Sequence, residues 1–247
     1  MNSSEKTAQL LKMLGRPPYV HGVTELAARL ECGKSGTFKL LAALVESGLA
    51  AQTADHKYSL GPAVFVLGET FKERIGLETS VTPFLEKLRD ATGENASFSM
   101  LVNGKAVLLA RAESPRMVRV AGNVGEERPI YAGANGKVLG AWLPQKRLAS
   151  VMKSLTFEAF TEKTITNADD LLAEFKKIRE DGYALSDGEL NIETVGIGAP
   201  IKDENGTVRA ALSLAAPRMR LDEKKTDEYV VLVKETADEI SRALFTT

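Results

Sequence analysis

Residues 24–48 contain two short amphipathic patterns separated by a glycine, an arrangement typical of a helix-turn-helix. We expect the first helix to start at Thr24, whose hydroxyl can cap a free backbone N–H. Leu26, Ala27 and Leu30 then fall on one face, which we expect to be buried. Gly33 is expected to supply the sharp turn between the helices, because glycine adopts turn conformations without a Cβ clash.

The second helix is expected to run from about residue 34 to Ser47 and to end at Gly48. Its spacing predicts a buried stripe of Phe38, Leu41, Ala42 and Val45. Its exposed side would then carry four polar residues near its N-terminal end. They are Lys34, Ser35, Thr37 and Lys39. Short polar and cationic side chains at that end can reach base edges and phosphates in the major groove, so we expect double-stranded operator DNA as a partner.

The segments on either side complete a winged helix-turn-helix domain over residues 1–62. Residues 4–14 predict an opening helix, and residues 49–54 and 57–60 predict a hairpin wing with its turn at Asp55-His56. A small structural domain without DNA binding is the alternative for this region. Residues 1–62 hold seven Lys/Arg against five Asp/Glu, a net charge of +2, which is only mildly basic. One copy would therefore bind DNA weakly, and we expect a homodimer that presents two such domains.

Residues 63–78 are expected to form a linker helix. Val64, Leu67, Phe71 and Ile75 recur at spacings of three and four, which predicts an apolar stripe. This stripe would pack either on a second copy of the chain or on the rest of the same chain, and both alternatives remain open.

Residues 79–247 alternate helix and strand patterns, as expected of an α/β sensor domain. Helices are predicted over 83–92, with a stop at Gly93, over 167–182, with Asn167 as cap, and around 229–244. Asn103-Gly104 predicts a tight hairpin between two strands within 97–110. Further strands are expected over 117–120, 195–201 and 208–215.

Composition excludes several classes of protein. The 247 residues, 44% of them hydrophobic, suffice for one large or two smaller globular domains. No apolar run is long enough for a membrane span, and the polar start lacks a signal-peptide pattern, so we expect a cytoplasmic protein with no membrane partner. The single cysteine and two histidines lie in the first 62 residues, which argues against a metal site or cofactor. The larger half therefore has no cysteine or histidine to act as nucleophile or base, so we predict no catalytic residues and no enzyme. A phosphate loop is excluded as well, because Val138 follows Lys137 where Ser or Thr would bind magnesium.

The order of motifs along the whole chain resembles the IclR-type transcriptional regulators. The residues that carry it are the helix-turn-helix, the wing end YSLG, and the later GANGK, DGYALSDGE, GAPIKDENG and ALSLAAP. The resemblance implies an α/β chain with an N-terminal winged helix-turn-helix, a linker helix and a GAF-like effector-binding domain. It also implies dimers, which often pair into tetramers on DNA. Lys39 stands where such proteins often have an Arg, which changes the base contacts that are available.

The resemblance places an effector pocket at the start of the GANGK helix, at the DGYALSDGE loop and on the two following strands. Carried over by position, it nominates Ala134, Asn135, Ser186, Asp187, Thr194, Gly196, Ser213 and Ala215. The first N–H groups of a helix are unpaired and favour an anion, so a carboxylate is the expected ligand group. We therefore expect a ligand-responsive repressor that senses a small organic acid. The alternative is a small-molecule-binding module that acts through protein contacts without operator recognition.

Overall fold

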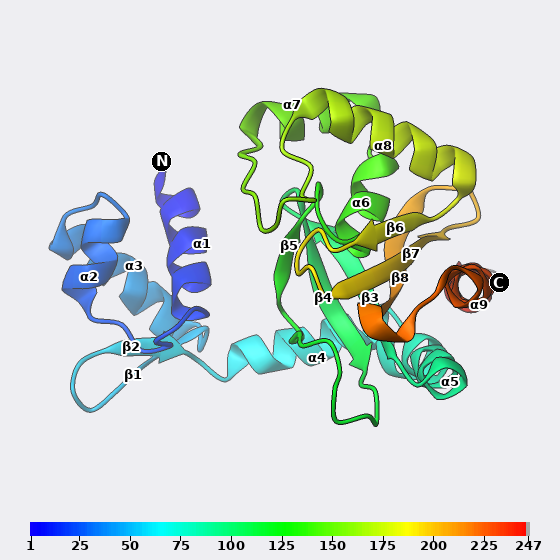
Figure 1. Ribbon diagram of the computed structural model, residues 1–247. Helices are drawn as coiled ribbons and strands as arrows, with labels where there is room; N and C mark the ends of the chain where they lie inside the picture. The colour runs from blue at the N-terminus through cyan, green and yellow to red at the C-terminus, as the bar shows by residue number, and fades with distance from the viewer. Residues whose placement is uncertain (246–247) are drawn as a thin grey trace. The chain divides into compact units, whose positions relative to one another are not determined.

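The computed structural model describes residues 1–245 of the chain (Figure 1). They divide into two compact units, residues 1–75 and the chain from residue 76 onward, and each is described by itself. No helix among the described residues combines the length and the hydropathy that a bilayer crossing requires.

The first unit is a winged helix-turn-helix followed by one long helix. Its elements are α1 (Ser3–Leu14), α2 (Val23–Arg29), α3 (Lys34–Glu46), β1 (Ala50–Gln52), β2 (Tyr58–Leu60) and α4 (Ala63–Arg74). Leucines from α1, α2 and α3 form its core, closed by Tyr58 of the wing. The opening helix, the helix pair and the wing predicted from the sequence are all present.

The turn between α2 and α3 differs from the prediction. Gly33 caps α3 in an extended conformation with φ of −64°, whereas Glu31 takes the left-handed conformation with φ of 50°. Glu31, and not Gly33, therefore makes the sharp turn. Thr24 is likewise not a cap, because α2 begins one residue earlier, after Gly22, and has no side-chain cap.

The predicted buried stripe of α3 is wrong by about one residue in phase. Leu41 is buried as expected, but Phe38 is 54% exposed and Val45 37% exposed, and Ala42 is exposed too. The buried positions are Thr37, Leu41 and Leu44. Thr37 can be buried because its hydroxyl donates to the carbonyl oxygen of Gly33, at 3.2 Å, and so stays hydrogen-bonded away from water.

The second unit contains one antiparallel sheet and its helices. The elements are a π-helical turn (Leu77–Val81), α5 (Thr82–Thr92), β3 (Asn95–Val102), β4 (Lys105–Ala112), β5 (Glu127–Pro129), α6 (Ala134–Ala141), α7 (Gln145–Ser154), α8 (Ala168–Asp181), β6 (Ala184–Asp187), β7 (Thr194–Lys202), β8 (Val208–Pro217), a 3-10 turn (Arg218–Arg220) and α9 (Glu223–Phe245). The strand order is β5-β4-β3-β8-β7-β6.

Several elements follow the predicted local signals. α5 ends at Gly93 in the left-handed conformation, Asn103 and Gly104 both have positive φ in the β3–β4 turn, and the Asn167 side chain caps α8. Residues 117–120 do not form the predicted strand. The backbone carbonyls of residues 118 and 120 instead accept hydrogen bonds from side chains, so they need no neighbouring strand.

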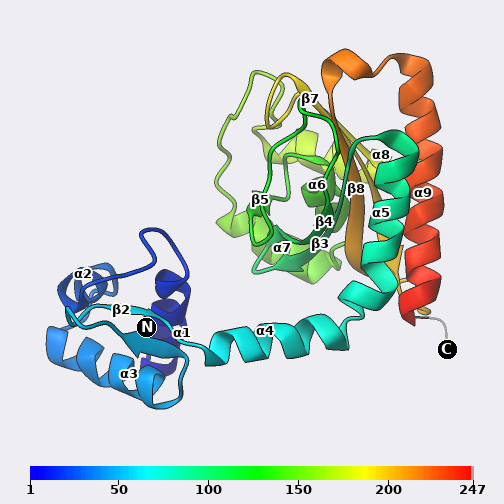
Figure 2. The ribbon, with the colours of Figure 1, turned by 90° about the horizontal axis from the view of Figure 1, so that it is seen from below.

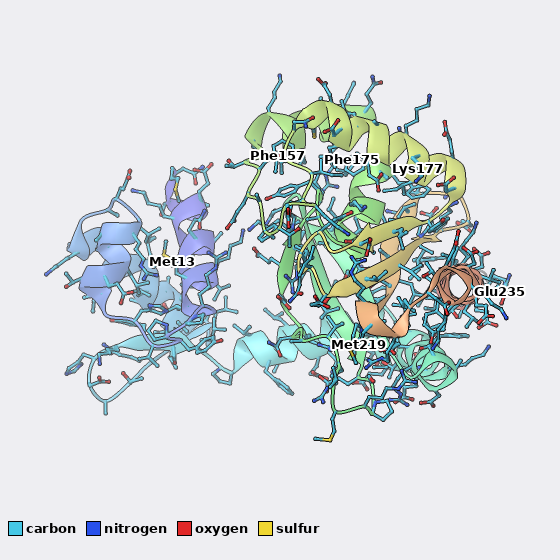
Figure 3. All side chains as sticks on the ribbon, viewed as in Figure 1. Met13, Phe157, Phe175, Lys177, Met219 and Glu235 are labelled. Atoms are coloured by element: carbon cyan, nitrogen blue, oxygen red, sulfur yellow. The ribbon has the colours of Figure 1, made fainter. Side chains whose placement is uncertain are left out.

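The two faces of the sheet have different coverings (Figures 1 and 2). α5 and α9 pack on one face, whereas α6 lies on the other and is backed by α8. In α8, Phe175 is fully buried against the α6 layer and Lys177 is exposed, as the side chains in Figure 3 illustrate. α6 approaches its neighbours closely, because a Cβ at Gly136 would overlap the carbonyl oxygen of Pro129 and one at Gly140 would overlap the Phe175 ring.

Candidate functional site

The exposed face of α3 is the candidate DNA-reading surface. Lys34, Ser35 and Lys39 are exposed as predicted, and Phe38 lies on the same face. Thr37 does not belong to this surface, because its side chain is fully buried. The sequence interpretation missed Phe38, since a large apolar residue was assigned to the core. An exposed aromatic ring here could contact a thymine methyl group.

Charge on this surface is available for phosphates. Neither Lys34 nor Lys39 has an ion pair among the described residues, whereas Lys57 in the wing is paired with Asp55 at 2.8 Å. The hydrogen bonds from Lys57 and Thr53 lower the pKa of Asp55 to about 2. The wing lysine is thus partly neutralised, and the α3 lysines are not.

The second unit contains a cavity of about 580 Å³ on the α6 side of the sheet. Seven of the eight nominated effector residues line it. They are Ala134, Asn135, Ser186, Thr194, Gly196, Ser213 and Ala215. The opposite wall is formed by residues 118–122 and by Glu126 and Arg128. Six discontinuous segments of the chain therefore meet around one space.

Small residues on neighbouring strands leave room for this cavity. Ser186, Gly196 and Ala215 are successive partners across β6, β7 and β8. In the adjacent row, Ser97 of β3 pairs with Ser213 of β8. Because side chains alternate along strands, these residues all project on the α6 side. Their small volume keeps this part of the sheet face from being filled.

Hydroxyl and amide groups form a polar cluster on the cavity floor. The Ser97 and Ser213 hydroxyls are 3.0 Å apart, and the Asn135 amide nitrogen donates to Ser97 at 3.3 Å and to Ser99 at 2.9 Å. The Asn135 Oδ1 atom is buried without a hydrogen-bond partner among the described residues. A buried polar atom left unpaired costs free energy, so a donor on a ligand would stabilise this site.

The start of α6 faces the same space. The Gly133 N–H, just before the helix, donates to Glu189 Oε2 at 3.0 Å. The first bond within the helix runs from Lys137 N to Gly133 O, so the N–H groups of residues 134–136 precede the helical ladder. The resulting partial positive charge favours an anionic group at Ala134 and Asn135.

The buried Lys137 binds the carboxylate that holds the start of α6. Lys137 is 1% exposed, and its ammonium contacts Glu174 Oε1 at 2.7 Å, Glu189 Oε1 and the Leu185 carbonyl oxygen at 2.7 Å. The other oxygen of Glu189 accepts from Gly133 and from the Ser186 hydroxyl. Lys137 therefore acts as a structural cation and not as a phosphate-binding lysine.

Asp187 does not lie on the cavity, contrary to its nomination. It follows Ser186 on β6, so its side chain points to the other face of the strand, where it pairs with Arg218 and, at 3.2 Å, with Lys163. Burial would raise its pKa, but these two cations outweigh that effect and lower it. DGYALSDGE is also not simply a loop, because residues 184–187 form β6.

Three arginines that line the cavity were missed by the sequence interpretation. Arg111 of β4, Arg119 and Arg128 all line the cavity. No spacing pattern identifies them, because they converge only through the β3–β4 hairpin and the loop that follows. Among the described residues no cluster of His, Cys, Asp or Glu could hold a metal ion.

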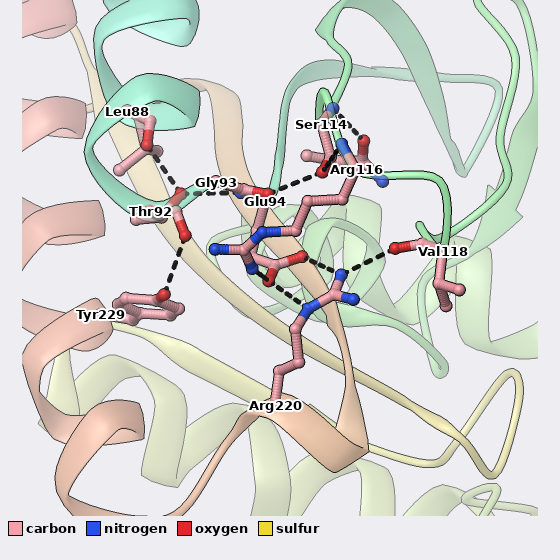
Figure 4. A network of polar contacts seen from close by, with 10 residues as sticks. Leu88, Thr92, Gly93, Glu94, Ser114, Arg116, Val118, Arg220 and Tyr229 are labelled. Atoms are coloured by element: carbon pink, nitrogen blue, oxygen red, sulfur yellow. Dashed lines mark hydrogen bonds and ion pairs between the residues drawn. The ribbon is translucent and has the colours of Figure 1, made fainter.

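The loop over the cavity is fastened by a second buried ion-pair network (Figure 4). Glu94 is 1% exposed and pairs with Arg116 and with Arg220, whose Nε lies 2.6 Å from Glu94 Oε1. Arg220 also donates to the Val118 carbonyl oxygen at 3.0 Å. The hydrogen bond with Glu94 raises the pKa of Arg220. Residues 116–118 are therefore tied to the ends of β3 and β8.

Comparison with known proteins agrees with this geometry. The family model described as the bacterial transcriptional regulator IclR C-terminal domain matches residues 70–242, and the model for the IclR helix-turn-helix domain matches residues 3–54. The chain belongs to the IclR family. It is therefore a DNA-binding transcriptional regulator.

Individual relatives extend over nearly the whole chain. The HTH-type transcriptional regulator KdgR of Escherichia coli is 29% identical over 98% of this chain and 92% of its own length. The HTH-type transcriptional repressor AllR of Escherichia coli is 28% identical over 97% of this chain and 89% of its own. A solved IclR homologue from Microbacterium hydrocarbonoxydans, complexed with 4-hydroxybenzoate, has the same fold, with a TM-score of 0.79 at 19% identity over 98% of this chain and 99% of that one.

Replacing Lys137 by Met should lower the free energy of unfolding of the second unit by about 3 kcal/mol or more, because two carboxylates lose their buried counter-charge. Adding Glu189→Gln to Lys137→Met should recover part of that loss. Lys176→Met, at an exposed residue of α8 with a 3.9 Å ion pair, is the matched control and should change it by less than about 1 kcal/mol. Denaturant unfolding measures all three, and a Lys137→Met protein as stable as the control would contradict a structural role.

Proposed function

We propose that this regulator is a repressor whose operator affinity changes when a small organic acid binds the cavity of the second unit. The observation that carries the proposal is the cavity itself, which combines a helix start, four serine side chains and an unpaired amide oxygen. A carboxylate suits the helix start, and a hydroxyl or other donor on the same ligand suits Asn135 Oδ1. Ala134, Asn135, Ser186, Thr194, Gly196, Ser213 and Ala215 are the proposed effector residues.

Two of the relatives support the kind of activity proposed. AllR is named a transcriptional repressor, and the Microbacterium homologue holds 4-hydroxybenzoate, a molecule with a carboxylate and a hydroxyl. Operator DNA would be bound by Lys34, Ser35, Phe38 and Lys39, in a protein working in the cytoplasm. We place the functional boundaries at 1–62, 63–78 and 79–247.

α4 supports a homodimer, with pairing of dimers into a tetramer as a further step. No side chain of this helix is buried, and Phe65 is 71% exposed, Leu67 60% and Phe71 39%. Apolar side chains that gather on one helix are usually covered by a partner. A second copy of α4 is the proposed partner, because a two-fold axis there would present two copies of α3 to successive half-sites.

Lys39→Ala should weaken specific operator binding by on the order of 1 kcal/mol or more, because a phosphate or base contact is lost. Lys12→Ala removes the same charge from an exposed position on α1 and is the control. Fluorescence anisotropy with DNA from upstream of the gene itself measures both. Equal binding by the two folded variants would remove Lys39 from the interface.

Phe71→Asp should raise the dimer dissociation constant, because a carboxylate would be buried in an apolar contact. Thr70→Asp introduces the same charge on the polar flank of α4 and should leave assembly nearly unchanged. Sedimentation velocity at micromolar concentration distinguishes them. A wild-type protein that sediments as a monomer would refute the α4 interface.

Asn135→Leu keeps the side-chain size but removes the amide, so it should abolish the effector response while operator binding persists. Asn205→Leu, in the exposed β7–β8 turn, is the control. Isothermal calorimetry with a panel of small carboxylates, followed by operator binding with and without the ligand, tests the proposal. Native effector affinity in Asn135→Leu would show that the ligand binds elsewhere.

A further inference from the structure

Arg111 extends the polar row on the cavity floor beyond the nominated effector residues. In the antiparallel register it is the direct partner of Ser97, which is itself the partner of Ser213. Arg111, Ser97 and Ser213 therefore form one line across β4, β3 and β8, and all three line the cavity. The arginine stands at the end of this line farthest from the start of α6, which packs over Gly196 and Gly198 of β7.

The guanidinium of Arg111 is only partly satisfied by protein groups. It donates to the carbonyl oxygens of Val120 and Gly122, which uses two of its five N–H donors. No carboxylate lies within ion-pair distance of it in the described part of the chain. Burial lowers the pKa of Arg111, and the nearby charges of Glu113 and Glu126 only partly oppose this effect.

The other charged groups around the cavity are already engaged or exposed. Arg119 pairs with Glu113 at 3.5 Å, and Arg128 pairs with Glu126. Glu193 also borders the cavity but is exposed to solvent. Arg111 is thus a partly buried cation in the cavity wall that has donors to spare and lacks a counter-ion.

We propose that the effector is a dicarboxylate, with one carboxylate at the start of α6 and the second bound by Arg111. This inference rests on the proposed function, which supplies the first carboxylate. β4 and β7 are three strand spacings apart, about 14 Å between backbones. The one carboxylate of a monocarboxylic acid therefore cannot contact both the start of α6 and Arg111. One guanidinium balances the single charge of a carboxylate better than the nearly double charge of a phosphate monoester.

The test is calorimetry on the full chain with matched pairs of ligands. Succinate, glutarate and adipate are compared with butyrate, pentanoate and hexanoate, which have the same chain lengths and one acidic group fewer. For at least one pair the dicarboxylate should bind the wild-type protein about tenfold more tightly or better, since a charge-assisted contact with a guanidinium is gained.

Variants of Arg111 then identify the residue that reads the second group. In Arg111→Gln the preference should fall to within about threefold while affinity for the monocarboxylate stays within about twofold. Arg111→Lys should restore part of the preference, because it keeps the charge without the planar fork. Arg209→Gln, at an exposed arginine paired with Asp203 in the β7–β8 turn, is the control and should retain the full preference.

The possible results separate a failure of the dicarboxylate inference from a failure of the proposed function on which it rests. Equal affinity of mono- and dicarboxylates for the wild-type protein would overturn the inference and leave the proposed function standing. A preference that survives in Arg111→Gln would assign the second group to another residue and also overturn the inference. If no carboxylate binds, both the proposed function and the inference fail. The ligand comparison in the wild-type protein remains decisive even if Arg111→Gln does not fold.

Discussion

The burial of the Lys137 ammonium is the constraint on which the proposed effector site depends. Removing such a charge from water costs several kcal/mol unless hydrogen-bonding partners of opposite charge surround it. The partners here come from separate elements, Glu174 from α8 and Glu189 from the turn after β6. The second oxygen of Glu189 receives the Gly133 N–H, so the same carboxylate that neutralises the lysine also fixes where α6 begins. The anion-attracting helix start is thus set by a charge buried one turn further on.

Much of the fold could be predicted because its signals are local. The stop at Gly93, the Asn103-Gly104 turn and the Asn167 cap each depend on a residue's own backbone preference or nearest hydrogen bonds. Errors arose where burial depends on distant partners. Thr37 is buried in place of Phe38 because its hydroxyl bonds to a nearby carbonyl, whereas hydrophobicity alone favours the phenyl ring. Residues 117–120 look like a strand but meet arginine side chains in place of a neighbouring strand.

The candidate site was predictable to a similar degree. Positions carried over from family motifs gather around one cavity because those motifs lie on adjacent strands and on the helix above them. Asp187 is the exception. Residues 184–187 form a strand, in which side chains alternate between the two faces, so Asp187 faces away from the cavity that Ser186 lines. The sequence alone could not nominate Arg111. Its place beside Ser97 depends on the register of the β3–β4 hairpin, and this register shifts at a bulge between Phe98 and Ser99.

The loop that forms one wall of the cavity is held in different ways along its length. Its first half is fastened to Glu94 through Arg116 and Arg220, a network that contains no cavity-lining side chain (Figure 4). Its second half is held by two side chains that line the cavity: Arg111 donates to the carbonyl oxygens of residues 120 and 122, and Asn95 donates to that of residue 120 at 2.8 Å. Because Arg111 has N–H donors to spare, an anion bound there as proposed would add to these contacts beside the second half of the loop. The ligand contact proposed at Arg111 therefore lies beside the second half of the loop and apart from the Glu94 network.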